Sequence, residues 1–148
     1  EKLWEMGFKN IFVLDFSEKA QDSFKTRVPD FPRSQILVED FFQHQGSYDY
    51  MVEHTFFSSL PVTLREPYVK HVHKILKPQG RLIGLLFNHH FPHDGPPFGA
   101  LNTEYERLFS PYFKFHHFRM AYNSIKPRNN RELFILFKKQ ERIFNKKQ

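Results

Sequence analysis

Residues 10–16 read Asn-Ile-Phe-Val-Leu-Asp-Phe and are followed directly by Ser17 and Glu18. A short, continuous apolar run between polar residues is typical of a strand that is buried on both faces of a sheet. Ser17 can cap a following helix that runs to about Arg27, with Glu18 in its first turn. A buried strand that leads straight into a helix predicts an α/β fold.

The rest of the chain continues this alternation and then departs from it. Strands separated by helices predict a parallel sheet with right-handed crossovers. Two final strands with no helix between them predict an antiparallel hairpin at the edge of the sheet. We expect strands at 35–39, 48–53, 81–87, 114–122 and 132–137, and helices between Pro61 and Lys77 and from Thr103, as its cap, to Phe109.

The first residues indicate that the sequence begins inside a helix. The apolar positions Leu3, Trp4 and Met6 suit the end of an amphipathic helix, and Gly7 suits its C-terminal stop. No Ser, Thr, Asp or Asn cap precedes these positions. We therefore expect that a segment N-terminal to the first residue is absent from this sequence.

Composition excludes several classes of protein. The chain has 148 residues, no cysteine and 40% apolar residues, with Phe occurring 19 times. Such a chain can bury a core, whereas a disulfide framework, a cysteine zinc site and a thiol nucleophile are excluded. No apolar run approaches the roughly 18 residues of a membrane span, and no secretory signal opens the chain. We expect a soluble protein of the cytoplasm.

The formal net charge of +6 raises the hypothesis of a nucleic-acid partner. Much of the excess lies at the C-terminal end, and a basic tail is more often a solvated end than a phosphate-binding arm. No helix-turn-helix, zinc-finger or RNP-like pattern accompanies it, so we expect no nucleic-acid partner. The basic residues of this end are Lys138, Lys139, Arg142, Lys146 and Lys147.

Polar residues stand where successive predicted strands end. Asp15-Phe16, Asp40-Phe41 and Glu53-His54 each follow an apolar run. Ligands of open α/β sheets bind beyond the carboxyl ends of the strands, where a carboxylate can accept hydrogen bonds from ribose hydroxyls. A second carboxylate can accept a hydrogen bond from an adenine amine, while the ring of the Phe that follows it stacks on the base. The pattern therefore predicts a nucleoside pocket. The structural alternative is that Asp15 only caps a helix and Asp40 only ends a strand.

Several segments resemble class I S-adenosylmethionine-dependent methyltransferases. Residues 15–20, Asp-Phe-Ser-Glu-Lys-Ala, resemble their second-strand segment, and residues 40–42 resemble their adenine segment. Residues 75–82 resemble the Leu-Lys-Pro-x-Gly turn before their fifth strand. Gly-Pro-Pro-Phe at 95–98, combined with Glu-His-Thr-Phe-Phe at 53–57, is similar to the thiopurine methyltransferase family and its thiol and halide branch. The resemblance covers most of the chain.

The resemblance implies a Rossmann-like methyltransferase sandwich, a mostly parallel sheet with an antiparallel C-terminal hairpin. It also implies S-adenosylmethionine as cofactor and S-adenosylhomocysteine as product. His54 stands where the family often has Arg or Tyr near the cofactor and the substrate, so we assign it to both the catalytic and the cofactor-binding residues. By the same resemblance, Asp15 and Phe16 bind the ribose side of adenosine, Asp40 and Phe41 bind adenine, and Phe57, Pro96, Pro97 and Phe98 form the acceptor pocket.

Two parts of the family pattern are missing from the sequence. Neither the glycine-rich loop that follows the family's first strand nor the N-terminal segment that closes over its site is present. In the family's strand order, the first strand lies between the strands that match residues 10–16 and 48–53. Without it, backbone donors in the core would be unpaired. We therefore expect residues 1–148 to be a single methyltransferase-like domain that is incomplete at its N-terminus and lacks its central strand.

The expected reaction is displacement of the methyl group from a sulfonium by a small, soft nucleophile: a thiol, a thiopurine or a halide. Positioning and electrostatics would supply most of the catalysis. A thiol with a pKa of about 8.5 needs no strong base, although His54 is a candidate for a weak one. The partner would be a small-molecule acceptor and the protein a monomer. The alternative is a non-catalytic methyltransferase-like binding module.

One cluster of histidines raises the hypothesis of a metal site, which we reject. His89, His90 and His93 lie close to Asp94 in sequence, and zinc accepts such ligands. No predicted helix holds them, and their spacing matches no strong motif. We interpret them as a polar loop and expect no metal.

Overall fold

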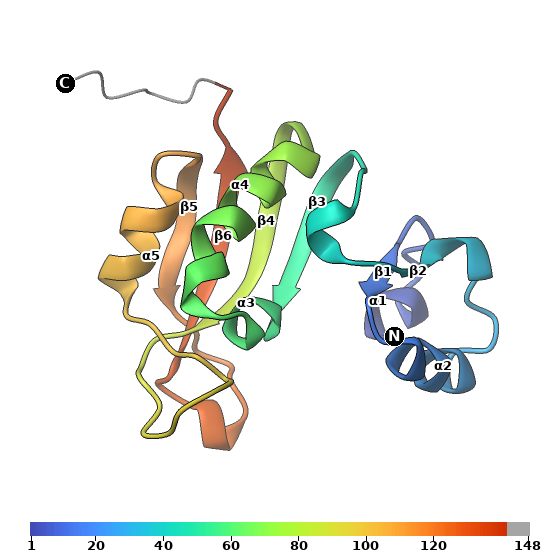
Figure 1. Cartoon of the computed structure of the whole chain (residues 1–148), viewed down its shortest axis with the longest axis horizontal. Helices are drawn as coiled ribbons and strands as arrows, with labels where there is room; N and C mark the ends of the chain where they lie inside the picture. The colour runs from blue at the N-terminus through green and yellow to red at the C-terminus, as the bar shows by residue number, and fades with distance from the viewer. Residues whose placement is uncertain (142–148) are drawn as a thin grey trace. The chain divides into compact units, whose positions relative to one another are not determined.

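The computed structural model describes residues 1–141 and divides the chain into two compact units, Glu1–Gln45 and Gly46–Gln148. Figure 1 draws both units. Arg142, Lys146 and Lys147 of the predicted basic end lie outside the described residues. No helix within residues 1–141 combines the length and the apolar character that a bilayer crossing requires.

The first unit is a small two-stranded parallel sheet with helices packed against it. Val13 lies opposite Ile36, and Asp15 lies opposite Val38. Its core is aromatic: the rings of Trp4 and Phe31 lie 4.7 Å apart. Along the chain its elements are α1 (Lys2–Glu5), β1 (Val13–Asp15), α2 (Glu18–Arg27), a 3₁₀ turn (Arg33–Gln35), β2 (Ile36–Val38) and a second 3₁₀ turn (Phe41–Gln43).

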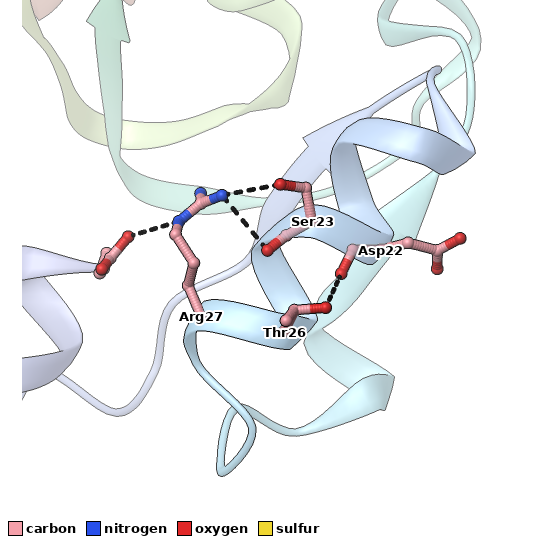
Figure 2. A network of polar contacts seen from close by, with 5 residues as sticks. Asp22, Ser23, Thr26 and Arg27 are labelled. Atoms are coloured by element: carbon pink, nitrogen blue, oxygen red, sulfur yellow. Dashed lines mark hydrogen bonds and ion pairs between the residues drawn. The ribbon is translucent and has the colours of Figure 1, made fainter.

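Polar side chains hold α2 in place within this unit. The buried Gln21 amide donates to the backbone oxygens of Val13 (3.3 Å) and Leu37 (3.0 Å), which ties α2 to both strands. Figure 2 shows the other end of α2, where the Arg27 guanidinium donates to the Ser23 hydroxyl at 3.0 Å and binds the Glu1 carboxylate at 3.0 Å. The bond to Glu1 links the helix to the start of the chain.

The second unit is a four-stranded sheet in the order β3-β4-β6-β5. β3 is parallel to β4, whereas β6 runs antiparallel to both β4 and β5. The described residues of β3 pair with β4 alone, so β3 is an edge strand of this sheet. Its elements are β3 (Tyr48–His54), α3 (Phe56–Ser59), a 3₁₀ turn (Val62–Leu64), α4 (Arg65–Ile75), β4 (Leu76–Phe87), α5 (Asn102–Phe109), β5 (Phe113–Met120), a 3₁₀ turn (Lys126–Arg128) and β6 (Glu132–Lys139).

The core of the second unit lies between its sheet and α4 and α5, which cover one face (Figure 1). Large aromatic side chains with less than 2% of their surface exposed fill this layer. Aromatic side chains each bury a large apolar area, which accounts for much of the phenylalanine content of the chain. The members are Phe57, Tyr68, Tyr105, Phe109, Phe113 and Phe137.

The predicted fold class is confirmed: the chain is α/β, with parallel pairing early and an antiparallel hairpin at the end. Ser17 caps α2 as expected, because its hydroxyl accepts a hydrogen bond from the Ala20 N–H at 3.2 Å. The predicted first strand is shorter than expected. It covers only Val13–Asp15, and Phe12 before it has 44% of its surface exposed.

Three predicted boundaries in the second unit are wrong. The long helix begins at Arg65, because residues 62–64 form a 3₁₀ turn first. The strand expected at 81–87 already begins at Leu76. The predicted Lys77–Gly80 turn therefore lies inside β4, where Gln79 takes a left-handed φ of 66°. Thr103 does not cap α5, because the helix already begins at Asn102, whose N–H donates to the side-chain oxygen of Asn88 at 2.9 Å. A distant residue thus supplies the acceptor that local sequence reasoning assigned to a neighbour.

Candidate active site

Two aspartates lie at or just after the carboxyl ends of the strands in the first unit. Asp15 ends β1, and its Oδ1 accepts a hydrogen bond from the Ser17 N–H at 2.8 Å. Asp40 follows β2, and its Oδ1 accepts from the Phe42 N–H at 2.9 Å. Each carboxylate is thereby oriented through one oxygen. Within residues 1–141, no hydrogen bond to the second oxygen of either aspartate is formed, so each retains acceptor capacity.

The aromatic residues beside these aspartates differ in exposure. Phe16 has 78% of its surface exposed, whereas Phe41 is buried and meets Phe42 edge to face, with ring centroids 5.3 Å apart. The His44 imidazole nearby contacts the Glu39 carboxylate at 2.8 Å. The first unit therefore presents two oriented carboxylates, one exposed ring and one buried ring.

In the second unit, Glu53 is a buried carboxylate near the end of β3, with 1% of its surface exposed. It accepts hydrogen bonds from the Phe57 N–H at 3.0 Å and from the Tyr68 hydroxyl. Burial raises the pKa of Glu53, and these hydrogen bonds oppose that rise in part. Between Glu53 and Phe57 the chain passes through Thr55, whose φ of 68° is left-handed. Glu53 therefore fixes a sharp turn at the end of the strand.

His54 is the last residue of β3 and is exposed. Its Nε2 lies 3.3 Å from a guanidinium nitrogen of Arg128, which also lies 3.3 Å from Oε1 of Glu132. Glu132 has 3% of its surface exposed and accepts from the Ser124 hydroxyl at 2.8 Å. His54 and Arg128, which are 74 positions apart in the sequence, thus meet at the end of β3.

A small cavity lies at the same end of this sheet, and both buried glutamates line it. Glu53 comes from β3 and Glu132 from β6. Sequence reasoning singled out neither Glu132 nor Arg128, since nothing local marks them. The only available signal was the polar loop 124–131 between the last two strands. The full lining is Glu53, Thr55, Phe57, Ser58, Leu85, Leu86, Phe87, Tyr105 and Glu132.

The predicted acceptor residues lie in the loop between β4 and α5 and in α3. The Phe98 N–H donates to the Ser58 oxygen at 2.6 Å, which joins the Pro96-Pro97-Phe98 segment to α3. Phe57 is fully buried, with its ring 5.2 Å from that of Tyr68, so it packs in the core and lines the cavity from inside. Its predicted contact with an acceptor stays a prediction.

The histidine-rich loop forms no metal centre in the described part of the chain. Among residues 1–141, no three side chains of His, Asp or Glu come together in an arrangement that could hold a metal ion. His89 instead packs against Phe91 with the two rings tilted and their centroids 4.3 Å apart, and Phe91 also contacts Phe87.

The predicted site residues divide between the two units. Asp15, Phe16, Asp40 and Phe41 belong to the first, and His54, Phe57 and Pro96–Phe98 belong to the second. Each unit brings its own residues to the carboxyl ends of its parallel strands, which is where ligands of α/β sheets bind.

The chain is similar to known methyltransferases. Residues 4–147 match the family described as thiopurine S-methyltransferase. Probable thiol methyltransferase 2 of Arabidopsis thaliana is 29% identical over 108 residues, which are 70% of this chain and 48% of that protein. Thiocyanate methyltransferase 1 of Brassica oleracea is 26% identical over 103 residues, 66% of this chain and 46% of that protein. The chain thus spans about half the length of these relatives.

Solved structures share the fold. A 1,6-didemethyltoxoflavin-N1-methyltransferase of Burkholderia thailandensis, crystallised with bound 1,6-didemethyltoxoflavin and S-adenosylhomocysteine, matches with a TM-score of 0.72 at 14% identity. The match covers 95% of this chain and 65% of that one. An S-adenosylmethionine-dependent methyltransferase of Methanosarcina mazei matches with a TM-score of 0.65 at 19% identity, over 85% of this chain and 80% of that one.

Proposed function

The chain belongs to the thiopurine S-methyltransferase family, and from this premise we propose that the protein methylates a small, soft nucleophile with S-adenosylmethionine. The observation that carries the proposal is the family match, which extends over residues 4–147 and includes every candidate site residue. The names of the two plant relatives, a thiol and a thiocyanate methyltransferase, support a thiol, thiopurine or halide-like acceptor.

The residues of the first unit suit the adenosine part of the cofactor. Asp15 would accept hydrogen bonds from the ribose hydroxyls, with Phe16 beside them, and Asp40 would accept from the adenine amine, with Phe41 against the base. The second oxygen of each aspartate, which accepts no hydrogen bond within residues 1–141, supports this assignment. When bound, the cofactor supplies a methyl group attached to a sulfonium sulfur. The leaving group would be a neutral thioether, which requires no protonation.

The residues of the second unit would serve the acceptor. Pro96, Pro97 and Phe98 offer an apolar wall to a polarisable nucleophile, with Phe57 behind it, and the bond from Phe98 to α3 holds that wall in place. His54 would lie close to both the cofactor and the acceptor. The work of these groups is to orient the acceptor and to keep water away, which suits a reaction that depends on positioning.

Calorimetry of the full-length protein with S-adenosylmethionine tests the cofactor assignment. Asp15→Ala should weaken binding on the order of 10- to 100-fold, because it removes charge-assisted hydrogen bonds to the ribose. Asp22→Ala is the matched control, since it removes the same charge from the exposed face of α2 in the same unit. No binding by the wild type would overturn the function, and equal affinities of the two variants would overturn the pocket.

A methyl-transfer assay with thiols, thiopurines and halides then tests the reaction. Product formation with at least one of these acceptors is the expected result. Cofactor binding without transfer to any of them would favour a non-catalytic binding module instead.

We further propose that both units belong to one methyltransferase domain, which the family match across both of them supports. The proposed location is the cytoplasm, the proposed state is a monomer, and no nucleic acid takes part. Cell fractionation, analytical ultracentrifugation and a salt-dependent nucleic-acid binding assay test these three points separately.

A further inference from the structure

The contact between His54 and Arg128 determines which imidazole nitrogen carries the proton. A guanidinium has N–H donors and no acceptor. At the 3.3 Å separation of Arg128 and Nε2 of His54, the hydrogen bond therefore runs from arginine to histidine, and Nε2 must present its lone pair. If Nε2 carried the proton, its N–H would face an N–H of the Arg128 guanidinium, and two donors would meet without an acceptor.

This bond uses the only lone pair that a neutral imidazole offers. In the neutral ring one nitrogen donates and the other accepts. With Nε2 accepting from Arg128, the proton lies on Nδ1, and neither nitrogen is available to take a proton from a third group. His54 in this state donates a hydrogen bond and does not act as a base.

Arg128 is held where it makes this bond. Its guanidinium contacts the buried Glu132 carboxylate at 3.3 Å and lies 5.2 Å from the ring centroid of Phe87. Glu132 is itself fixed by the Ser124 hydroxyl at 2.8 Å. An ion pair with a buried carboxylate and a ring under the guanidinium both limit the positions of the arginine.

We propose that Arg128 is a positioning residue that holds His54 in the neutral Nδ1–H tautomer, so that His54 orients the methyl acceptor as a hydrogen-bond donor and takes no proton from it. This inference rests on the proposed methyl transfer. It narrows the acceptor class to nucleophiles that are anionic without help from the protein: halides, and thiols that have already lost their proton to water.

The chemical step balances without a base. A lone pair of the anionic acceptor forms the new bond to the methyl carbon, and the electron pair of the broken carbon–sulfur bond stays on sulfur, which becomes a neutral thioether. No proton moves to or from His54 in this step.

The tautomer is measured directly by long-range proton–nitrogen correlation NMR on the full-length protein with ¹⁵N-labelled histidine, without cofactor. The wild type should show a protonated Nδ1 and an unprotonated Nε2 for His54. Arg128→Gln should shift the ring toward the Nε2–H form. The matched control Arg131→Gln, which removes the same charge at an exposed position of the same loop, should leave the ring unchanged.

An Nε2–H ring in the wild type, or the same tautomer in wild type and Arg128→Gln, would overturn the proposal. Because this readout needs neither cofactor nor turnover, its failure is distinct from a failure of the proposed methyl transfer.

Kinetics of His54→Ala give a second readout, which separates a hydrogen-bond donor from a general base. Iodide has no proton to lose and 2-mercaptoethanol has one, so a base would matter for the thiol alone. We expect kcat/KM to fall by the same factor for both acceptors. An additional loss on the order of 100-fold for the thiol, as expected when a general base is removed, would show that His54 takes the proton and would refute the proposal.

Discussion

At the scale of single residues, Glu53 combines deep burial with an ionisable side chain. A carboxylate out of water is costly when ionised, and the two donors that reach it, the Phe57 N–H and the Tyr68 hydroxyl, offset only part of that cost. Burial together with the nearby carboxylate also raises the pKa of Tyr68 well above its usual value, so the phenol stays a donor. The Glu53–Tyr68 pair stabilises the turn at the end of β3, where His54 lies.

We expect Glu53→Gln to change how stability depends on pH. Since the pKa of Glu53 is raised in the folded state, the folded protein holds this proton more tightly than the unfolded chain does. The wild type should therefore lose stability relative to Glu53→Gln as the pH rises above the ordinary glutamate value of 4.5. Urea unfolding of both proteins between pH 4 and pH 7 measures this difference.

Glu66→Gln is the control with the opposite sign. The Lys70 ammonium lowers the pKa of the exposed Glu66, so that carboxylate stabilises the fold above its ordinary value, and this contribution disappears as the pH falls. A stability difference for Glu53→Gln that does not vary with pH, or that varies as for Glu66→Gln, would contradict the assignment.

At the scale of secondary-structure elements, the antiparallel strands place three cations in one row. Lys138 of β6 lies directly opposite Arg81 of β4 on one side and Lys114 of β5 on the other. Directly opposed like charges destabilise a sheet. The pKa of the neighbouring His116 is lowered. The first cause is partial loss of contact with water, and the next causes are the charges of Lys114, Lys138 and Arg81.

Lys138→Glu should stabilise the protein, because it turns two repulsive cross-strand pairs into attractive ones. We expect a gain of roughly 0.5–1 kcal/mol in the free energy of unfolding at low salt, shrinking as salt screens the charges. Lys138→Gln, which only removes the repulsion, should give a smaller gain. Urea denaturation at low and high ionic strength measures both, and a Lys138→Glu protein no more stable than the wild type at low salt would refute the prediction.

At the scale of the whole molecule, the division into two units raises the question of whether either is stable alone. The first unit has 45 residues and a two-stranded sheet over one small cluster of apolar side chains. A domain of this size buries too little surface for much stability, and isolated two-stranded sheets are marginal in water. We infer that Glu1–Gln45 depends on the rest of the protein for its stability.

The chain carries its own probes for this inference. Its single tryptophan, Trp4, is buried in the first unit, and all six tyrosines lie in the second. Urea unfolding followed by tryptophan fluorescence and by tyrosine absorbance should give coincident transitions, which indicates one cooperative unit. Trp4→Phe is the control for the origin of the fluorescence signal. Two separated transitions would show that the units unfold independently and would count against a single domain.

Much of the fold and part of the site could be predicted from local sequence. The apolar run at 10–16 with Ser17 after it predicted β1, α2 and the cap between them, because strand burial and helix capping depend on neighbouring residues. The aspartates after the first two strands were predicted for the same reason. The sequence also pointed to the methyltransferase family, which the match over residues 4–147 supports.

The parts of the fold and of the candidate site that local sequence did not predict depend on contacts between residues far apart in the chain. The β6 strand brings Glu132, and the turn before it brings Arg128, to the end of β3, where the Arg128 guanidinium lies 3.3 Å from Nε2 of His54. The Asn88 side chain accepts from the first N–H of α5 across a loop. Sequence alone determined the elements and their strand-end carboxylates, since these follow from local periodicity. The contacts of His54 were decided by tertiary structure, because a hydrogen bond depends on distance in space and not on spacing in sequence.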